Sequence, residues 1–393
     1  MSTTREADVI VIGAGPAGLA SARELMRVGR RVMVLERGHA VATSWRSHRH
    51  GLRLHTVRRL SGLPGARIPS EYGRYPSSAD LVRYLERYTA TSDIDVRTGV
   101  CVVSVSTAPE GSTGWLVVAA DGARHHAETV IMATGYNRVP FVPDLPGLDA
   151  YTRPIVHVAD YRGGDQFTGA DVLVIGAGNA AAEAATEMVA SDARRVRMAI
   201  RTTPHIVRRR IWGVPMQAIA IALSPVPTRV ADLVAALLAR LTVPDLSRKR
   251  LSRPRSDLYT RVARDHSVPV HDNGIVELLE SGHVTPVPAA VGFLGDAVLL
   301  ADGSLVHPEA VVFATGYRRG LQEVLAGLDL LDDRGDPRTR SGTAAAPGFY
   351  FVGFTVTATG ALRQLATDAR HVARAEWRHQ NRGVRSAVSR HHS

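Results

Sequence analysis

The chain has a single cysteine, Cys101, among its 393 residues. One cysteine cannot form an internal disulfide, a CxxC redox pair or a thiolate metal cage. A mechanism based on two cysteines is therefore excluded, no metal site is expected, and the composition suits a reducing cytoplasm.

Long hydrophobic runs are also missing. The most apolar later stretch, MQAIAIALSPVPTRVADLVAALLARL (residues 216–241), is interrupted by Pro225, Pro227 and charged residues. No run reaches the roughly 18 to 20 residues of a spanning helix, and the N-terminus lacks the pattern of a secretion signal. We expect no transmembrane segment. The stretch should form two helices that pack on the core or cover a substrate channel, with contact to a membrane surface as the alternative.

The formal charge of +11 has no nucleic-acid-binding motif beside it, so nucleic acid is not an expected partner. The charge is typical of a solvated, arginine-rich surface, and the alternative is attraction of anionic ligands such as dinucleotide phosphates. The C-terminal residues 378–393 form a basic tail that should be loose at its end.

The chain contains the same architectural unit twice. VIVIGAGPAGLASARE (residues 9–24) nearly repeats as VLVIGAGNAAAEAATE (residues 172–187), and each copy predicts strand, glycine turn and helix. Each is followed later by an Asp-Gly hairpin and a buried strand that ends in Ala-Thr-Gly-Tyr. The alternation of strand and helix predicts an α/β fold with two dinucleotide-binding, Rossmann-like domains.

The first glycine turn has the spacing of a dinucleotide site. Gly13 makes the tight bend, Gly15 lets the backbone approach a pyrophosphate, and Gly18 lets helix and strand pack closely. The next strand ends at Glu36, whose carboxylate can accept hydrogen bonds from ribose hydroxyls, which favours FAD or NAD. The residues predicted to bind this cofactor are Gly13, Gly15, Pro16, Ala17, Gly18, Glu36 and Arg37.

The second turn differs at the end of its following strand, where Arg201 stands in place of an acid. An acid there would repel a 2′-phosphate and an arginine would pair with it, so this site favours NADPH. The alternative for Arg201 is a solvated arginine. The run of residues 208–210 is more typical of a charged surface, although one of its arginines could assist the phosphate. The residues predicted to bind NADPH are Gly176, Gly178, Asn179, Ala180, Arg201 and Thr202.

With these residues in place, almost the whole chain resembles the class B flavin-dependent monooxygenases, most of all the YUCCA type. The segments that carry the resemblance are GAGPAGLASA, SWRSHRHGLRLHT, GRYPSSADLVRYLERY, ATGYNRVPFVPDLPGL, VLVIGAGNAAAEAA, ATGYRR and FYFVGFTVTATGALRQLATDA. The resemblance implies an FAD domain made from both ends of the chain, with the NADPH domain inserted in it. We expect the FAD domain in residues 1–150 and 311–393, and the NADPH domain in residues 151–310 with a helical insertion at about 204–251.

The resemblance also implies a mechanism in which the cofactors carry the chemistry. NADPH reduces FAD, NADP⁺ stays bound, and the reduced flavin reacts with dioxygen to give a hydroperoxide that passes one oxygen atom to a small organic substrate. The outcomes open to such a chain are N- or S-oxidation, Baeyer–Villiger oxidation, or oxidative decarboxylation of a keto acid. YUCCA likeness favours an aromatic amino-acid-derived keto acid, and a homodimer is left open.

Further site residues follow from the resemblance. Trp45 and His55 should lie on the flavin side, His55 as a candidate catalytic residue, with a core tryptophan and a structural histidine as the alternatives. Gly360 and Ala361 should begin a helix whose dipole stabilises negative charge on the reduced flavin. The interdomain connections should contribute Ala133, Thr134, Gly135, Thr315 and Gly316.

One family fingerprint is altered. The expected Phe-x-Gly-x-x-x-His reads from Tyr151 to His157 with Arg153 in place of the glycine. Arginine avoids positive φ, which puts the conformation of this linker in doubt. His157 is a candidate catalytic residue, with a linker residue that hydrogen-bonds the backbone as the favoured alternative.

Two other functions compete with the monooxygenase. An FAD- and NAD(P)H-dependent reductase of similar fold would act on a quinone or another non-disulfide acceptor. Such reductases usually carry Gly-Asp in the final flavin motif, where this chain has Gly353-Phe354. A non-catalytic redox sensor is disfavoured by two intact glycine turns.

Overall fold

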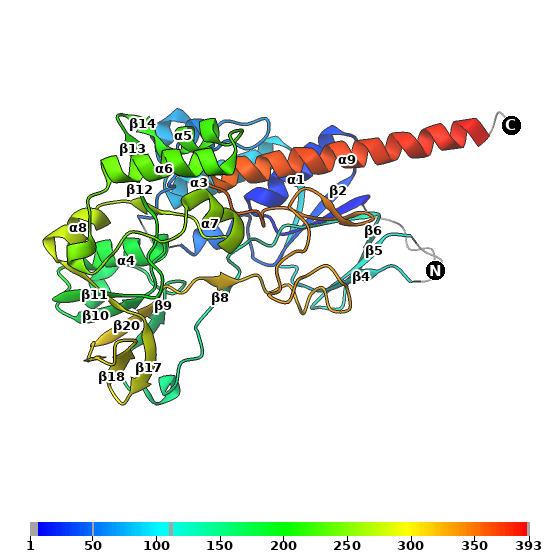
Figure 1. Cartoon of the computed structure of the whole chain (residues 1–393). Coiled ribbons are helices and arrows are strands. Elements are labelled where there is room, and N and C mark those ends of the chain that lie inside the picture. The colour runs from blue at the N-terminus through cyan, green and yellow to red at the C-terminus, as the bar shows by residue number, and fades with distance from the viewer. Residues whose placement is uncertain (1–6, 49–50, 110–112, 391–393) are drawn as a thin grey trace.

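The computed structural model describes residues 7–48, 51–109 and 113–390, and of residues 382–390 the backbone alone. Two sheets that lie side by side organise the chain (Figure 1). The first has the order β22-β23-β7-β1-β2-β3, in which only the edge strand β22 is antiparallel to its neighbour. Its strands are β1 (Val9–Ile12), β2 (Val32–Glu36), β3 (Asp95–Thr98), β7 (Thr129–Met132), β22 (Ala344–Ala346) and β23 (Phe349–Phe351).

The second sheet has the order β16-β11-β10-β20-β9 and is parallel throughout. Its strands are β9 (Ile155–His157), β10 (Asp171–Ile175), β11 (Arg195–Ile200), β16 (Val284–Pro288) and β20 (Ala310–Phe313). The series β16-β11-β10-β20 repeats the series β3-β2-β1-β7, so the sequence repeat is a repeat of topology. The predicted fold class is confirmed, because the second sheet is built from residues inserted between two parts of the first.

Each sheet carries a small antiparallel meander, as the Asp-Gly turns predict. The meander strands are β4 (Val102–Thr107), β5 (Trp115–Ala119) and β6 (Arg124–Ala127), and then β17 (Ala290–Leu294), β18 (Ala297–Leu300) and β19 (Leu305–Val306). Gly122 and Gly303 have φ of 87° and 83°, a region in which glycine avoids the strain of a side chain.

Helices cover the first sheet on the side of the long C-terminal helix (Figure 1). They are α1 (Pro16–Arg27), α2 (Thr43–Arg46), α3 (Ser78–Thr91) and α9 (Ala361–Arg390). The apolar face of α9, including Leu365 and Val372, shares a core with Leu19 and Leu25 of α1. Residues 378–390 continue α9 as helix, and the last three residues of the expected loose tail lie outside the described part of the chain.

The second unit has its own helices and the predicted insertion. α4 (Asn179–Ala190) and α8 (Ile275–Ser281) pack on its sheet. The apolar stretch forms two helices as predicted, α5 (Met216–Leu223) and α6 (Thr228–Thr242), next to α7 (Leu258–Asp265). The short strands of this insertion are β12 (Ile206–Arg208), β13 (Arg210–Ile211), β14 (Val214–Pro215) and β15 (Val270–Asp272). Among the described residues no helix is long and apolar enough to cross a membrane.

The chain passes between the two sheets along paired strands. β8 (Val139–Pro140) and β21 (Tyr317–Arg318) form an antiparallel pair between the two units (Figure 1). Because β20 belongs to the second sheet, the expected domain boundary after residue 310 falls inside this strand. Short 3₁₀ turns lie at Arg58–Leu60, Ser70–Tyr72, Leu148–Ala150, Gly164–Phe167 and Ser247–Lys249.

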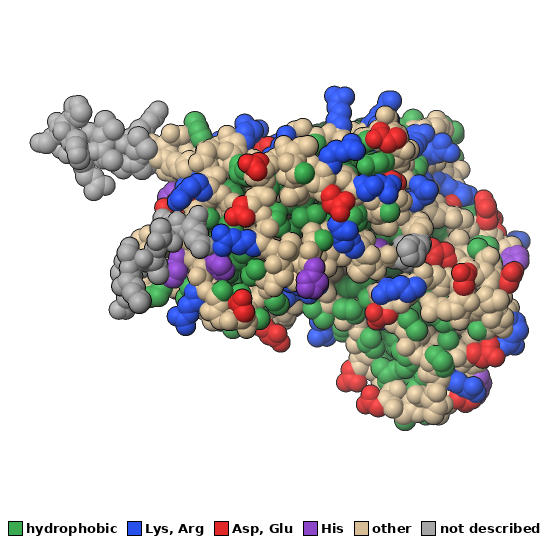
Figure 2. All heavy atoms as spheres, turned by 180° about the vertical axis from the view of Figure 1, so that it is seen from behind, with side chains coloured by type: hydrophobic (Ala, Val, Ile, Leu, Met, Phe, Trp, Pro, Cys, Tyr) green, Lys and Arg blue, Asp and Glu red, His purple; other side chains and the backbone are tan. Residues whose placement is uncertain are grey.

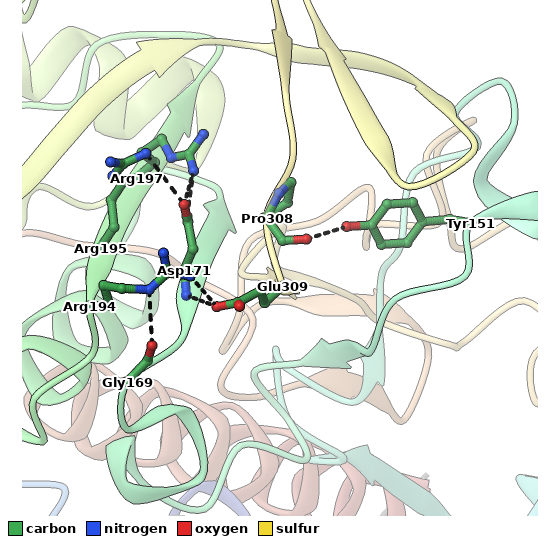
Figure 3. A network of polar contacts seen from close by, with 8 residues as sticks. All are labelled: Tyr151, Gly169, Asp171, Arg194, Arg195, Arg197, Pro308 and Glu309. Atoms are coloured by element: carbon green, nitrogen blue, oxygen red, sulfur yellow. Dashed lines mark hydrogen bonds and ion pairs between the residues drawn. The ribbon is translucent and has the colours of Figure 1, made fainter.

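Buried charges fix the end of the second sheet that is remote from its glycine turn (Figure 3). Asp171 begins β10 and pairs with Arg197 of β11, and both are buried. The Asp171 backbone N–H donates to Glu309, which in turn pairs with Arg194 at 2.7 Å. Together these contacts fix the register of β10, the strand that leads into the second glycine turn. On the face drawn in Figure 2, basic and acidic side chains are interspersed, as in a solvated surface.

Candidate functional site

The first glycine turn has no room for side chains at two of its three glycines. Gly13 follows β1 with φ of 108°, and an added Cβ would lie 2.6 Å from the Ala133 carbonyl oxygen. A Cβ on Gly18 would lie 1.8 Å from the Gly13 carbonyl oxygen. Glycine is therefore required at both positions for α1 to start this close to β1 and β7.

The N-terminus of α1 is open to a ligand. Gly15 is its N-cap, no side chain caps the helix, and a Cβ on Gly15 would meet nothing within 4 Å. Pro16 and Ala17 at the start of the helix are buried. The amides of the first turn have no intrahelical partner, and together with the helix dipole they form an anion site. This open cradle fits the pyrophosphate of FAD.

Glu36 is buried at the end of β2 and holds the turn. Its Oε2 accepts from the Ala14 N–H at 2.8 Å, and its Oε1 accepts from the Gly38 N–H at 2.8 Å and the Thr43 hydroxyl at 3.1 Å. A carboxylate has about four acceptor sites, so these three bonds leave capacity for a ribose hydroxyl. The neighbouring Arg37 is exposed.

The second turn repeats this geometry at the start of α4. Gly176 has φ of 143°, and a Cβ there would lie 2.4 Å from the Ala314 carbonyl oxygen, the counterpart of Ala133. Gly178 is the N-cap, has no side-chain cap and borders open space. Ala180 beside it is exposed. The second turn therefore also fits a dinucleotide pyrophosphate.

Asn179 has a structural contact that its place in the motif did not suggest. Its Nδ2 donates to the Pro269 carbonyl at 2.9 Å, and its Oδ1 accepts from the His271 N–H at 2.8 Å. The side chain thus fixes β15 against the start of α4.

Arg201 follows β11 and is exposed, as is Thr202. No hydrogen bond or ion pair engages the Arg201 guanidinium within the described residues. Arg208, by contrast, pairs with Asp272. Arg201 is thus a cation at the strand end where a 2′-phosphate would lie, and this position fits NADPH.

His55 connects the two units. Its ring stacks on His271 with centroids 4.9 Å apart, and its Nε2 lies 3.3 Å from Glu183 Oε1 on α4. Burial and the nearby Arg209 lower the pKa of His271 to about 4, so His271 is neutral at pH 7. Trp45 is half-buried against the first core and meets His48 edge-on at 5.3 Å.

The start of α9 is held by a residue that the motifs did not reveal. Gly360 has φ of 103° and directly precedes Ala361, the first residue of α9. Gln217 of α5 is buried, accepts from the Val57 N–H at 2.9 Å and donates to the Thr359 carbonyl at 3.0 Å. The available signal was that Gln217 is the one polar residue within MQAIAIAL.

The two Ala-Thr-Gly connections make tight reversals. Gly135 and Gly316 have φ of 90° and 87°. The Thr315 hydroxyl donates to the Phe141 carbonyl, whereas the buried Thr134 hydroxyl has no hydrogen-bond partner within the described residues. An unpaired buried hydroxyl next to the first turn is consistent with a bound ligand there.

His157 lies in the second sheet, on β9. Its Nδ1 accepts from the Ala159 N–H at 3.1 Å, its ring meets Tyr317 edge-on at 5.3 Å, and burial lowers its pKa. These contacts are those of a buried linker histidine.

The altered fingerprint causes no backbone strain. Arg153 is not among the residues with positive φ, and its guanidinium pairs with Asp296 at 3.2 Å on the surface. Tyr151 donates its hydroxyl to the Pro308 carbonyl at 3.2 Å (Figure 3). Its ring also packs against Phe293. The doubt about the local conformation of this linker is thus answered, because Arg153 adopts a backbone conformation that needs no glycine.

A small pocket, with a cavity volume of about 30 Å³, lies among the insertion helices. Its walls come from α5, α6 and α7, together with His271 of β15 and Ala358 shortly before α9. The lining is mostly apolar. No group of side chains able to hold a metal ion occurs among the residues the structure describes.

Two dinucleotide cradles, one in each large sheet and linked by paired connecting strands, define a two-dinucleotide oxidoreductase. The family model "Pyridine nucleotide-disulphide oxidoreductase" matches residues 10–214. The chain belongs to this family, and within it to the class B flavin monooxygenases.

Two plant relatives place the chain more closely. It is 31% identical over 390 residues to indole-3-pyruvate monooxygenase YUCCA1 of Oryza sativa subsp. japonica, covering 95% of this chain and 93% of that protein. It is 31% identical over 383 residues to the probable indole-3-pyruvate monooxygenase YUCCA1 of Arabidopsis thaliana, covering 95% and 91%.

Solved structures agree with the fold. A double mutant of a flavin monooxygenase from Stenotrophomonas maltophilia matches with a TM-score of 0.71 at 25% identity, covering 95% of this chain and 99% of that one. The complex of OTEMO with FAD and NADP has the same fold, with a TM-score of 0.71 at 20% identity over 97% and 87% of the two chains. The chain is accordingly an NADPH-dependent flavin monooxygenase with FAD and NADPH as its cofactors, and the reductase alternative is not favoured.

Proposed function

We propose that this monooxygenase oxidatively decarboxylates a 2-oxo acid with an aromatic side chain. The 2-oxo acid, dioxygen, NADPH and a proton give the carboxylic acid with one carbon fewer, carbon dioxide, NADP⁺ and water. One oxygen atom of dioxygen enters the acid and the other enters water, while NADPH supplies two electrons.

The observation that carries this proposal is the mostly apolar pocket between α5, α6 and α7. It borders Ala358, two residues before Gly360, and Gln217 joins α5 to the same segment. An aromatic side chain in this pocket would lie beside the start of α9, where the resemblance expects the flavin. The relative from Oryza sativa subsp. japonica is an indole-3-pyruvate monooxygenase, and indole-3-pyruvate is an aromatic 2-oxo acid, which supports the same substrate class.

The cofactor chemistry is the reduction of flavin by NADPH and the activation of dioxygen. We propose that the first turn with Gly13, Gly15 and Gly18 holds the FAD pyrophosphate, Glu36 binds its ribose, and the α9 N-terminus stabilises negative charge. The other residues that we assign to this cofactor are Pro16, Ala17, Arg37, Trp45, His55, Ala133, Thr134, Gly135, Thr315, Gly316, Gly360 and Ala361.

We assign the second turn to NADPH. Gly176, Gly178 and Ala180 would contact the pyrophosphate, Arg201 and Thr202 would bind the 2′-phosphate, and Asn179 would position β15. In this proposal His55 is a positioning residue that keeps α4 against the flavin side through Glu183, and His157 is a structural linker residue.

Water must be kept from the reacting atoms, and the protein does this by covering them. We propose that α5 is this cover, because Gln217 bonds it to Val57 and Thr359, two segments of the flavin unit. If α5 moved away, water would reach the reacting atoms, and NADPH would be oxidised with hydrogen peroxide as the product while the substrate stays unoxygenated.

The proposal is tested by supplying the holoenzyme with NADPH and a panel of substrates in air. The panel holds phenylpyruvate, indole-3-pyruvate, a neutral aryl ketone, an aryl sulfide and an amine. We expect carbon dioxide and the shortened acid from the aryl 2-oxo acids, in equal amounts with NADPH consumed. Efficient oxygenation of the ketone, sulfide or amine without decarboxylation of either 2-oxo acid would refute the proposal.

Three further expectations concern the domain boundary, the cellular compartment and the oligomeric state. We place the end of the NADPH domain after β20, at about residue 313. We infer that the enzyme acts in the cytoplasm, with Cys101 as a free thiol. We also propose a homodimer, which exposed leucines along α6 such as Leu233, Leu237 and Leu241 would support; light scattering of the purified protein tests it.

A further inference from the structure

Arg209 is a partly buried cation next to a residue that lines the apolar pocket, Met216, and Glu183 is near enough to favour its charge without forming an ion pair with it among the described residues. The Arg209 guanidinium lies 4.2 Å from the centre of the Tyr75 ring and donates to the Leu54 carbonyl at 2.7 Å. Among the described residues no carboxylate forms an ion pair with it, and its Nε is buried without a hydrogen-bond partner. Burial lowers its pKa, which records the cost of keeping this charge away from water.

The position of Arg209 follows from the strands around the pocket. Val207 of β12 pairs with His271 of β15, and both line the pocket. Arg209 is two residues beyond Val207, and its carbonyl accepts from the N–H of Met216, another pocket residue. Arg209 itself does not line the pocket, but its backbone adjoins these pocket residues and its side chain contacts Leu54 and Tyr75 of the flavin unit.

Two further buried polar atoms near this cation lack hydrogen-bond partners within the described residues. They are the Tyr75 hydroxyl oxygen and His271 Nδ1. Buried polar groups are nearly always paired, so unpaired groups around one partly buried guanidinium indicate a place where a polar ligand binds. Because the unpaired charge is positive, that ligand is an anion.

We propose that Arg209 binds the carboxylate of the substrate while the aromatic side chain occupies the pocket between α5, α6 and α7. This inference rests on the proposed function and gives it a residue that selects acids over neutral ketones. Arginine suits the role because its planar guanidinium binds a carboxylate through two hydrogen bonds and keeps its charge when buried. His271, neutral at pH 7, can offer a hydrogen bond near Arg209 without adding charge.

The test uses two probes of equal shape, phenylacetate and the neutral phenylacetamide, titrated into oxidised holoenzyme and followed by the flavin absorbance. In Arg209→Met we expect phenylacetate to bind about 10- to 100-fold more weakly, since a charge-assisted hydrogen bond is lost, and phenylacetamide to bind within about twofold of the parent protein. The control is Arg210→Met, which removes an exposed neighbouring charge and should leave both probes unchanged. Arg209→Lys, which keeps a cation beside Tyr75, should retain part of the preference for the acid.

The inference is wrong if the parent protein does not bind phenylacetate, or if both probes weaken equally in the Met and Lys variants. It is also wrong if Arg209→Met weakens NADPH as much as phenylacetate, since Arg209 would then serve the cofactor. The enzyme could also bind phenylacetate through Arg209 and yet decarboxylate no 2-oxo acid. That result would support the anion site and refute only the proposed function.

Discussion

Replacing Arg201 with alanine should convert the enzyme from an NADPH-selective to an unselective one. Arg201 is exposed after β11 and engages no partner within the described residues, so its removal breaks no contact of the fold. The change in cofactor binding then reports the interaction with the 2′-phosphate directly.

The size of the effect follows from the interaction lost. A charge-assisted hydrogen bond contributes about 1.5 to 3 kcal/mol, which corresponds to a Kd for NADPH raised by roughly 10- to 150-fold. NADH lacks the phosphate, so its Kd should change by less than about twofold. Because the side chain is exposed, the difference should shrink as salt is added.

Both constants can be measured from the rate of anaerobic flavin reduction at increasing NADPH or NADH. Arg229→Ala is a matched control, since it removes an exposed arginine from α6 and should leave both cofactors unchanged. Equal losses for NADPH and NADH in Arg201→Ala would show that the arginine does not read the phosphate, and the assignment of the second site would fail.

Three further changes test the fold and the first site. Asp171→Asn leaves the buried Arg197 without its counter-charge and should lower the free energy of unfolding, measured in urea, by about 3 to 5 kcal/mol. A loss below about 1 kcal/mol would show that the ion pair does not stabilise the fold. Gly18→Ala places a Cβ 1.8 Å from the Gly13 carbonyl and should yield protein without bound flavin, so normal flavin content would contradict the described turn. Burial raises the pKa of Asp368 to about 6, so the folded state favours the protonated carboxyl. The free energy of unfolding should therefore fall by up to about 3 kcal/mol as pH rises from about 4 to about 6. Asp368→Asn should remove that decline from the pH profile of unfolding, and an unchanged profile would disprove the burial effect.

The glycine turns and their following strands could be predicted because their causes are local. Gly18 is dictated by the Gly13 carbonyl within the same strand–turn–helix unit, and Glu36 stands at the end of the strand that follows it. Gly13 is recognised from the motif, although the atom that crowds it, the Ala133 carbonyl oxygen, is distant in sequence. The two-domain fold followed from the repetition of that unit, and the helices α5 and α6 from a hydrophobic stretch divided by two prolines.

The parts that escaped prediction depend on contacts between segments distant in sequence. Gln217 meets Val57 across 160 positions, and Arg209 meets Leu54 across 155. No local pattern encodes such pairs, since they arise only when the insertion folds over the flavin unit. The motif also gave no hint that the Asn179 side chain bonds to β15.

The altered linker shows a limit of reasoning from a motif. The family glycine suggested a positive φ, but backbone demands are set by the actual path of the chain, and Arg153 adopts an ordinary conformation here. Its side chain gains an ion pair with Asp296 on the surface.

The central claim is that this chain transfers one oxygen atom from dioxygen to an organic substrate at the expense of NADPH. The most direct test supplies phenylpyruvate and NADPH under ¹⁸O₂ and analyses the product by mass spectrometry. The account predicts phenylacetate that carries one ¹⁸O atom, formed in equal amounts with NADP⁺. Oxidation of NADPH with hydrogen peroxide as the sole oxygen product, or phenylacetate without the label, would contradict it.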